Sequence, residues 1–147
     1  MIFWDTSAIV PLLVKEASSP SRVTLLRQDA DGVVWWATEI ECLSALCRRQ
    51  RERKIAPSGF QQGLSILKSI IASMNEVTPS EQIRSLAARL LQTHPLRTAD
   101  ALQLAAAITG STGDPRQLLF ACADERLAEA ARREGFTVFP FHQIQKK

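Results

Sequence analysis

The sequence predicts an α/β domain with a mostly parallel central sheet, flanked by helices and carrying a small helical elaboration. Short apolar runs without strict polar alternation are typical of strands that are covered on both faces. Helical patterns separate these runs, as they do in a sandwich of helix, sheet and helix layers. The 147 residues, 46% of them hydrophobic, suit one packed core, and no linker divides them. We therefore expect a single domain over residues 1–147.

The individual elements follow from these patterns. Strand character is found in four runs, at Ile2–Trp4 and at residues 33–36, 118–123 and 137–141. Amphipathic periodicity or helix-forming composition predicts helices at residues 6–14, 38–53, 60–74, 80–93, 99–109 and 125–133. The Pro-Ser-Gly run at 57–59 predicts a break before the third of these helices. The excess of helix between the second and third strands predicts the elaboration.

Composition excludes several classes of protein. Eighteen basic residues against 15 acidic ones give a net charge of +3, which permits a polyanionic partner without requiring one. Three cysteines and two histidines form neither a disulfide framework nor a zinc motif. The first residues lack a basic segment, and no 20-residue apolar run is present. We expect a cytoplasmic protein without a membrane partner.

Four acids occupy equivalent places in the predicted fold. Asp5 and Asp124 directly follow strands, whereas Glu41 and Asp100 lie in the first turns of helices. Taken singly, each acid is explained by helix capping or by the helix dipole, and Thr38 with Glu41 has the spacing of a capping box. Because the carboxyl ends of parallel strands share one edge of a sheet, the four acids are expected to converge there.

Converging carboxylates predict a metal site. Clustered carboxylates repel one another and raise each other's pKa unless a cation lies between them. A hard divalent ion such as Mg²⁺ or Mn²⁺ prefers oxygen ligands. Such an ion can activate water and offset the charge that develops on a phosphate. The pattern therefore indicates hydrolytic phosphoryl chemistry.

Four segments of the chain resemble the motifs of the PIN-domain family. They are residues 1–16 (MIFWDTSAIVPLLVKE), 38–49 (TEIECLSALCRR), 96–108 (LRTADALQLAAAI) and 118–139 (LLFACADERLAEAARREGFTVF). The resemblance extends over nearly the whole chain, with all four motifs in order, and its compact size is similar to that of VapC-type toxins. It implies a PIN-like three-layer sandwich and an Mg²⁺- or Mn²⁺-dependent endoribonuclease that hydrolyses RNA. It also implies inhibition by a cognate antitoxin protein, and it suggests a homodimer.

The resemblance assigns roles to individual residues. Asp5, Glu41, Asp100 and Asp124 match the family's catalytic acids, with Asp5 and Asp100 as the first choice of direct metal ligands. Thr6 and Ser7 match small hydroxyl residues that can hydrogen-bond the first carboxylate. Cys122 departs from the pattern, because relatives often have a hydroxyl residue there, and a hydroxyl-mediated role at this position is in doubt.

Other polar or aromatic residues receive more ordinary interpretations. Glu39 competes with Glu41 but is expected to be solvated, and Asp114 is interpreted as a turn residue. Arg97 is a candidate for contacting a substrate phosphate, or for an ion pair with the acids. For the basic run at 48–54, a solvated helix end is favoured over a phosphate-binding site.

Neither histidine lies at a spacing from an acid or a nucleophile that indicates a general base. The two adjacent tryptophans are more typical of a core or of a subunit interface than of stacking on nucleic-acid bases. These residues are His94, His142, Trp35 and Trp36.

Two other functions remain as alternatives. The chain could be a catalytically inactive PIN-fold binding module, although an intact set of four acids argues against this. It could also be a phosphoryl-transfer enzyme in which Asp5, at the end of a strand, accepts the phosphoryl group. Ser7 stands where one such class of enzymes needs a second Asp, and residues 124–126 lack the Lys that another class needs.

Overall fold

A fully parallel sheet forms the centre of the molecule. In the computed structural model, which describes residues 1–29 and 31–141, five strands pair in the order β3-β2-β1-β4-β5. The strands are β1 (Ile2–Trp4), β2 (Val33–Trp35), β3 (Asn75–Val77), β4 (Leu119–Ala121) and β5 (Val138–Phe139). Phe3 lies opposite both Val33 and Phe120, so the first strand of the chain is the central strand of the sheet.

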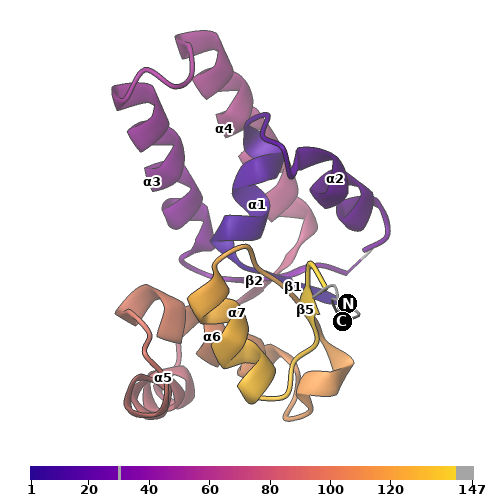
Figure 1. Ribbon diagram of the computed structural model, residues 1–147, viewed down its shortest axis with the longest axis vertical. Helices are drawn as coiled ribbons and strands as arrows, with labels where there is room; N and C mark the ends of the chain where they lie inside the picture. Colours follow the sequence, from indigo (N-terminus) through magenta and orange to yellow (C-terminus); the bar gives the residue numbers. More distant parts are fainter. Residues whose placement is uncertain (30, 142–147) are drawn as a thin grey trace, which may run out of the picture.

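Helices cover both faces of this sheet. One face carries α1 (Thr6–Leu13), α2 (Ser19–Arg27), α3 (Thr38–Arg51) and α4 (Pro57–Ser73). The opposite face carries α5 (Glu81–Thr93), α6 (Thr98–Gly110) and α7 (Glu125–Arg133), as Figure 1 shows. A short 3₁₀ helix, η1 (Pro115–Gln117), precedes β4. This arrangement confirms the predicted α/β class, the parallel sheet and the three layers.

Alternate side chains of β1, β2, β4 and β5 supply two separate cores. In β1, Ile2 and Trp4 pack with α1, α3 and α4, whereas Phe3 packs with α5, α6 and α7. The ring of Phe3 stacks on that of Phe120, with centroids 5.3 Å apart. Because both faces of β1 are buried, the strand contains no polar residue, and polar side chains begin where it ends.

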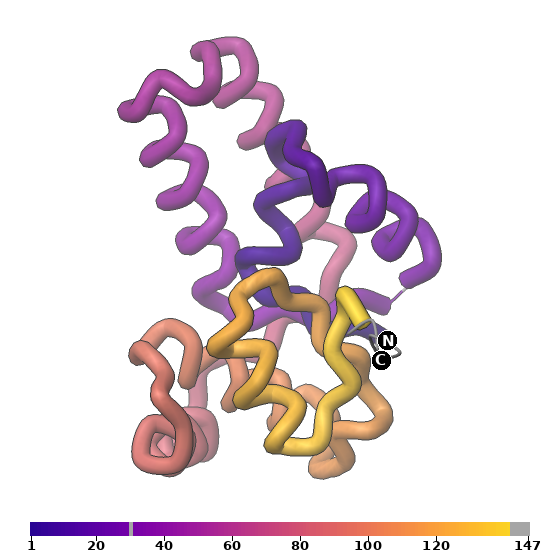
Figure 2. The backbone as a smooth tube through the Cα atoms, in the orientation of Figure 1, coloured from indigo at the N-terminus to yellow at the C-terminus, as the bar shows by residue number. Residues whose placement is uncertain are grey.

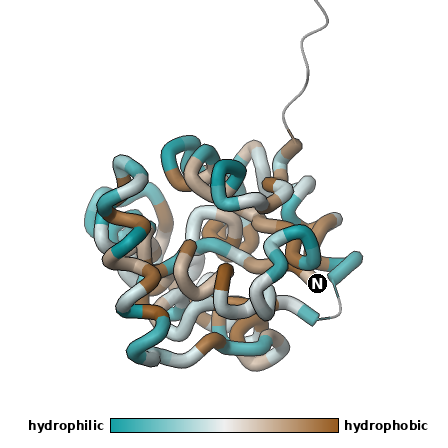
Figure 3. The backbone as a smooth tube through the Cα atoms, turned by 90° about the horizontal axis from the view of Figure 1, so that it is seen from below, coloured by the Kyte–Doolittle hydropathy of each residue, from teal (hydrophilic) through white to brown (hydrophobic). Residues whose placement is uncertain are grey.

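The helical elaboration is the antiparallel pair α3–α4. Figure 2 shows the two helices rising side by side from the sheet, joined by a short turn at their far end. Gly63 of α4 lies in close contact with Leu46 of α3, where a Cβ atom would meet the leucine side chain at 3.1 Å. In Figure 3, hydrophilic and hydrophobic residues alternate along the outer helices, as expected for elements with one solvated face.

Several predicted boundaries were wrong. Helix α4 begins at Pro57, because a proline in the first helical turn needs no hydrogen-bond donor and has a suitable φ, so the run at 57–59 is no break. The sequence interpretation also missed α2, whose amphipathic pattern is weak, and β3, whose residues Asn75 and Glu76 are exposed. The last predicted strand is shorter, ending at Phe139.

No helix within residues 1–29 and 31–141 combines the length and the apolar character needed to cross a membrane.

Candidate active site

Asp5 lies at the carboxyl end of the central strand and begins α1. Its backbone N–H donates to the carbonyl of Ala121, which continues the pairing of β1 with β4. Its side chain accepts the backbone N–H of Ser7 at 3.0 Å and so caps the helix. The residue is only 5% exposed, because the strand that positions it is enclosed by both cores.

Ser7 connects Asp5 to the loop that follows β4. The Ser7 hydroxyl donates to Oδ2 of Asp5 and accepts the backbone N–H of Ala123 at 2.8 Å. The Sγ atom of Cys122 lies 3.8 Å from the same Asp5 oxygen, close enough for a weak S–H donor. Cys122 therefore stands beside Asp5 although it lacks the expected hydroxyl.

Glu41 is held by a side chain of the first helix. The Thr6 hydroxyl donates to Oε2 of Glu41 at 2.8 Å. The resemblance implied Asp5 as the partner of Thr6, and this expectation was wrong. The predicted capping box is also wrong: the N-cap of α3 is Ala37, which makes no side-chain cap hydrogen bond. Thr38 is fully buried, and its Oγ1 accepts instead from the side-chain amide of Gln103 at 3.0 Å.

Asp100 and Asp124 complete the set of acids at the same edge of the sheet. Asp100 lies in the first turn of α6 and is half-buried. Asp124 is exposed and caps α7, since its Oδ1 accepts the backbone N–H of Leu127 at 2.9 Å. The capping roles of Asp5 and Asp124 are therefore real, and the capping bond of each uses only one of its two carboxylate oxygens.

One cavity brings the four acids together. Asp5, Glu41, Asp100 and Asp124 all line a cavity of about 470 Å³. Its wall also contains Thr6, Ser7, Val10, Glu16, Ala45, Arg48 and Arg49. Glu39 and Asp114 do not line it.

Basic residues extend this cavity in two directions. A cavity of about 570 Å³ shares Asp100 and Asp124 with the acid cavity and is lined by Arg97 and Arg126. Another, of about 400 Å³, shares Glu16, Arg48 and Arg49 with it and includes Lys54. Because these cavities share wall residues, they adjoin one another, and we refer to the three together as the groove. This placement changes the interpretation of the basic run at 48–54, since Arg48 and Arg49 lie beside the acids.

The carboxyl groups in this cavity affect one another. Burial raises the pKa of Asp5 to about 6, and the negative charges of Glu41 and Asp100 add to the rise, while the hydrogen bonds from Ser7 oppose it. Burial and the neighbouring Asp124 also raise the pKa of Asp100, although Arg97 and Arg126 partly offset this. Five acids but only two arginines, Arg48 and Arg49, line the cavity, so its walls carry more acidic than basic groups.

This donor set fits a hard cation, without forming a closed cage. Within residues 1–29 and 31–141, no three acid, histidine or cysteine side chains are close enough together to make a preformed metal site. The available ligands are carboxylate oxygens at an open cavity with excess negative charge, which suits an ion that keeps several water ligands.

Two polar residues of the site were missed by the sequence interpretation. Gln103 is buried in α6 and its amide lies 3.2 Å from Glu41 Oε2; a single amide in the apolar run 101–108 was the available signal. Arg126 follows Asp124 by two residues and faces the same groove as Arg97. His94 is buried against Glu134, away from the acid cavity, and His142 lies outside the described residues.

The fold and the site define a class of protein: a three-layer α/β domain with four acids at the carboxyl edge of a parallel sheet. The PIN domain family matches residues 2–133, nearly the whole chain, and the chain belongs to that family. The chain is similar to two curated relatives from Mycobacterium tuberculosis, ribonuclease VapC45 and ribonuclease VapC49, with 29% identity over 141 residues. The match covers 95% of this chain and 95% of each relative.

Solved structures share the fold at lower sequence identity. Mycobacterium tuberculosis VapC20, described as a sarcin-ricin loop cleaving toxin, has a TM-score of 0.68 and 15% identity, with 93% of this chain and 97% of that chain covered. FitAcB from Neisseria gonorrhoeae has a TM-score of 0.64 and 18% identity, with 97% of each chain covered.

Proposed function

We propose that this protein is a divalent-metal-dependent endoribonuclease and the toxin of a toxin–antitoxin pair. One observation carries the proposal: four acids from four separate segments line a single cavity at the carboxyl edge of the sheet. Membership of the PIN domain family supports it, as do the two curated relatives, which are named as ribonucleases.

The proposed metal ligands are Asp5, Asp100, Glu41 and Asp124, with Mg²⁺ or Mn²⁺ as the ion. Asp5 and Asp100 are the first choice of direct ligands: burial, and to a smaller extent neighbouring carboxylates, raise the pKa of both, and a bound cation would favour their charged forms. A bound divalent ion supplies positive charge to the scissile phosphate and lowers the pKa of water. The side chains of the chain itself prepare the site: Ser7 orients Asp5, and Thr6 orients Glu41.

The groove supports RNA as the substrate. Arg97 and Arg126 line one cavity together with Asp100 and Asp124, and Arg48 and Arg49 line the acid cavity itself. A polynucleotide that crosses the acid cavity presents phosphates to both groups of arginines, and an arginine fork suits phosphate oxygens. The phosphodiester between these flanking phosphates then lies at the acids, so an internal bond is cut. Arg49 pairs with Glu16 at 2.6 Å and exchanges this partner for phosphate when RNA binds.

Cleavage of RNA by the purified protein tests the proposal. We expect cleavage with Mg²⁺ or Mn²⁺ and none with EDTA, and we expect Asp5→Asn and Asp100→Asn to lower the rate at least about 100-fold. Asp114→Asn is the control, because Asp114 lies outside the acid cavity. A matched pair on α3, Glu41→Gln and Glu39→Gln, tests the choice between two neighbouring acids.

The same experiment addresses the alternative of a binding module. Wild-type protein that neither cuts RNA nor binds Mn²⁺ in a calorimetric titration would contradict the proposed activity and favour a catalytically inactive PIN-fold module. Variants of Asp5 and Asp100 that cut as fast as the wild-type protein would contradict the assignment of the site.

A cognate antitoxin is the proposed protein partner. The structural neighbours include a toxin–antitoxin complex from Klebsiella pneumoniae and FitAB bound to a DNA fragment. Co-expression with the product of a small adjacent gene tests this partner, with co-purification and loss of RNA cleavage as the expected results. Co-purification without inhibition would contradict the proposed antitoxin role.

We also propose a homodimer that uses the surface around the start of α3. Trp36 is 55% exposed and Ile40 is 65% exposed, which is unusual for two large apolar side chains four residues apart. Trp36→Ser with Ile40→Ser should convert the dimer to a monomer in analytical ultracentrifugation. A wild-type monomer at micromolar concentration would contradict this proposal.

A further inference from the structure

A buried amide connects three of the helices that carry the acids. Gln103 of α6 is only 1% exposed and lies three residues after Asp100. Its Nε2 atom lies 3.1 Å from Thr6 Oγ1, 3.0 Å from Thr38 Oγ1 and 3.2 Å from Glu41 Oε2. These acceptors belong to α1 and α3, so the amide of one helix contacts polar groups of two others.

The chemistry of the acceptors fixes which way the amide faces. A carboxylate only accepts hydrogen bonds, and the Thr6 hydroxyl already donates its hydrogen to Glu41 at 2.8 Å. Both therefore require the NH₂ group of Gln103 and not its carbonyl. The two amide hydrogens are shared among three oxygens, which makes this group the centre of the network.

The opposite end of the same amide is left without a partner. Within the described part of the chain, Oε1 of Gln103 is buried and accepts no hydrogen bond. Buried polar atoms are normally paired, and an apolar side chain of equal size would fill this position without an unpaired carbonyl. Gln103 therefore donates to the carboxyl group of Glu41, while its own amide oxygen, Oε1, stays without a partner.

We propose that Gln103 is a positioning residue that fixes the Glu41 carboxyl group for metal binding, an inference that rests on the proposed function. Gln103 and Thr6 both donate to Oε2 of Glu41. Oε1 of Glu41 has no donor among the residues that the structure describes, so it is the oxygen available to a cation in the acid cavity. Gln103 acts through Glu41 and does not touch substrate or metal.

Replacement of Gln103 by methionine tests the inference. Methionine has nearly the same size, removes the donor and also removes the unpaired carbonyl, so the variant should fold. We expect Gln103→Met to weaken Mn²⁺ binding in a calorimetric titration by roughly 10- to 100-fold, as for other residues that orient metal ligands. In RNA cleavage, kcat should fall while KM for RNA stays the same. Gln103→Asn, which keeps an amide but is too short to reach Glu41, should weaken Mn²⁺ binding in the same direction.

A double-mutant cycle separates positioning from a general structural role. In a Glu41→Ala background, Gln103→Met should change Mn²⁺ affinity less than about twofold, because the residue through which it acts is gone. Ser111→Ala is the matched control: it removes a buried hydrogen bond at the opposite end of α6, outside the acid cavity, and should bind Mn²⁺ and cut RNA as the wild-type protein does.

Two results would overturn the inference. One is unchanged Mn²⁺ affinity in Gln103→Met, and the other is an equal loss of affinity with and without Glu41. Both differ from failure of the proposed function, which shows as wild-type protein that binds no Mn²⁺ and cuts no RNA. Thermal melting of each variant confirms that the proteins compared are folded.

Discussion

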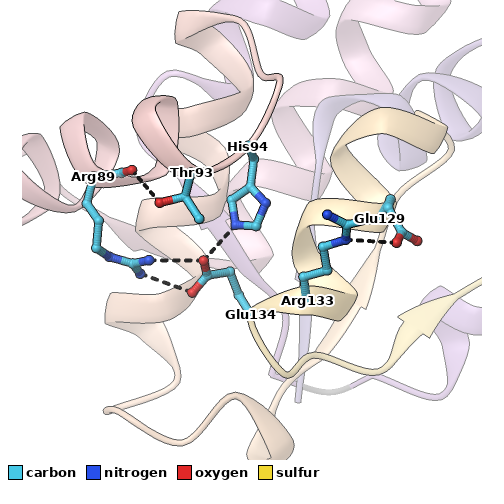
Figure 4. Close-up of polar contacts among 6 residues, drawn as sticks. All are labelled: Arg89, Thr93, His94, Glu129, Arg133 and Glu134. Atoms are coloured by element: carbon cyan, nitrogen blue, oxygen red, sulfur yellow. Dashed lines mark hydrogen bonds and ion pairs between the residues drawn. The ribbon is translucent and has the colours of Figure 1, made fainter.

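Glu134 Oε1 lies 2.7 Å from Nε2 of the buried His94 (Figure 4). The same carboxyl group receives two hydrogen bonds of 3.0 Å from the guanidinium of Arg89, so one acid joins α5, the turn after it and the end of α7. This contact fixes the segment that leads into Arg97 and Asp100 against the helix that follows Asp124. Its role in the fold is therefore to hold the segment that precedes Asp100 against the helix that Asp124 caps.

Removal of Glu134 should destabilise the protein. Glu134→Ala leaves the buried His94 and the half-exposed Arg89 without their partner, and we expect the free energy of unfolding to fall by about 1–3 kcal/mol. Glu129→Ala is the control, since its contact with Arg133 is exposed and should contribute less than about 1 kcal/mol (Figure 4). Urea unfolding measures both variants, and equal losses would contradict the distinction.

Glu134 should also make the fold sensitive to acid. The hydrogen bonds from Arg89, and then the contact with His94, hold the pKa of Glu134 below its usual value of 4.5. The stabilisation is therefore present above about pH 4.5 and is lost as the pH falls through the lower pKa of the folded state. Between pH 5 and pH 3, the melting temperature should fall more steeply for the wild-type protein than for Glu134→Gln. Parallel curves would show that this carboxyl group does not contribute.

Asp5 should make the stability of the fold depend on pH in the direction opposite to that of Glu134. Burial raises its pKa from 3.8 to about 6, so the folded state holds the proton at higher pH than the unfolded chain does. The contribution of this group is therefore most favourable below pH 4 and is lost as the pH rises to about 6. Without metal at pH 7.5, Asp5→Asn should stabilise the fold by up to about 3 kcal/mol, since one pKa unit corresponds to about 1.4 kcal/mol.

Added metal should reverse the order of stability of the wild-type protein and Asp5→Asn. Mn²⁺ should raise the melting temperature of the wild-type protein, because a ligand that binds only the folded state stabilises it. The melting temperature of Asp5→Asn should change much less. An equal rise in both proteins would show that the ion binds elsewhere.

Arg48 should contribute to RNA binding through phosphate. The logarithm of the affinity falls linearly with the logarithm of the salt concentration, and each lost phosphate contact makes this slope less steep by about 1. We expect this change for Arg48→Gln. Arg51→Gln on the same helix is the control, because Arg51 does not line the groove and should leave the slope unchanged. Binding is measured on a single-stranded RNA in EDTA, so that no cleavage occurs. Equal slopes for Arg48→Gln and the wild-type protein would remove Arg48 from the RNA-binding surface.

The sequence predicts most of the fold because both faces of the sheet are buried. The apolar strand Ile2–Trp4 ends at Asp5, and the run before Asp124 ends in the same way, so the change from apolar to acidic marks the edge of the sheet. Strand β3 has no such signal, since Asn75 and Glu76 lie at an exposed edge and need no apolar side chains.

The finer structure of the site depends on contacts between distant segments. Thr38 has the spacing of a capping residue, yet its hydroxyl accepts from Gln103, which is 65 positions away. Thr6 stands next to Asp5 in the chain but donates to Glu41, because α1 packs against α3. Sequence spacing predicts local partners and gives no information on which of several oxygens a buried amide will reach.

The position of β1 has a consequence for when the molecule becomes complete. The central strand β1 pairs with β4, which lies far later in the sequence: Phe3 is opposite Phe120. Asp5 is synthesised before Asp124, and the two can come together only after β4 has been made and has paired with β1. Such long-range pairing forms late. A chain in which β4 has not yet been made therefore lacks a complete acid cavity, and the proposed activity begins only after Asp124 has been synthesised.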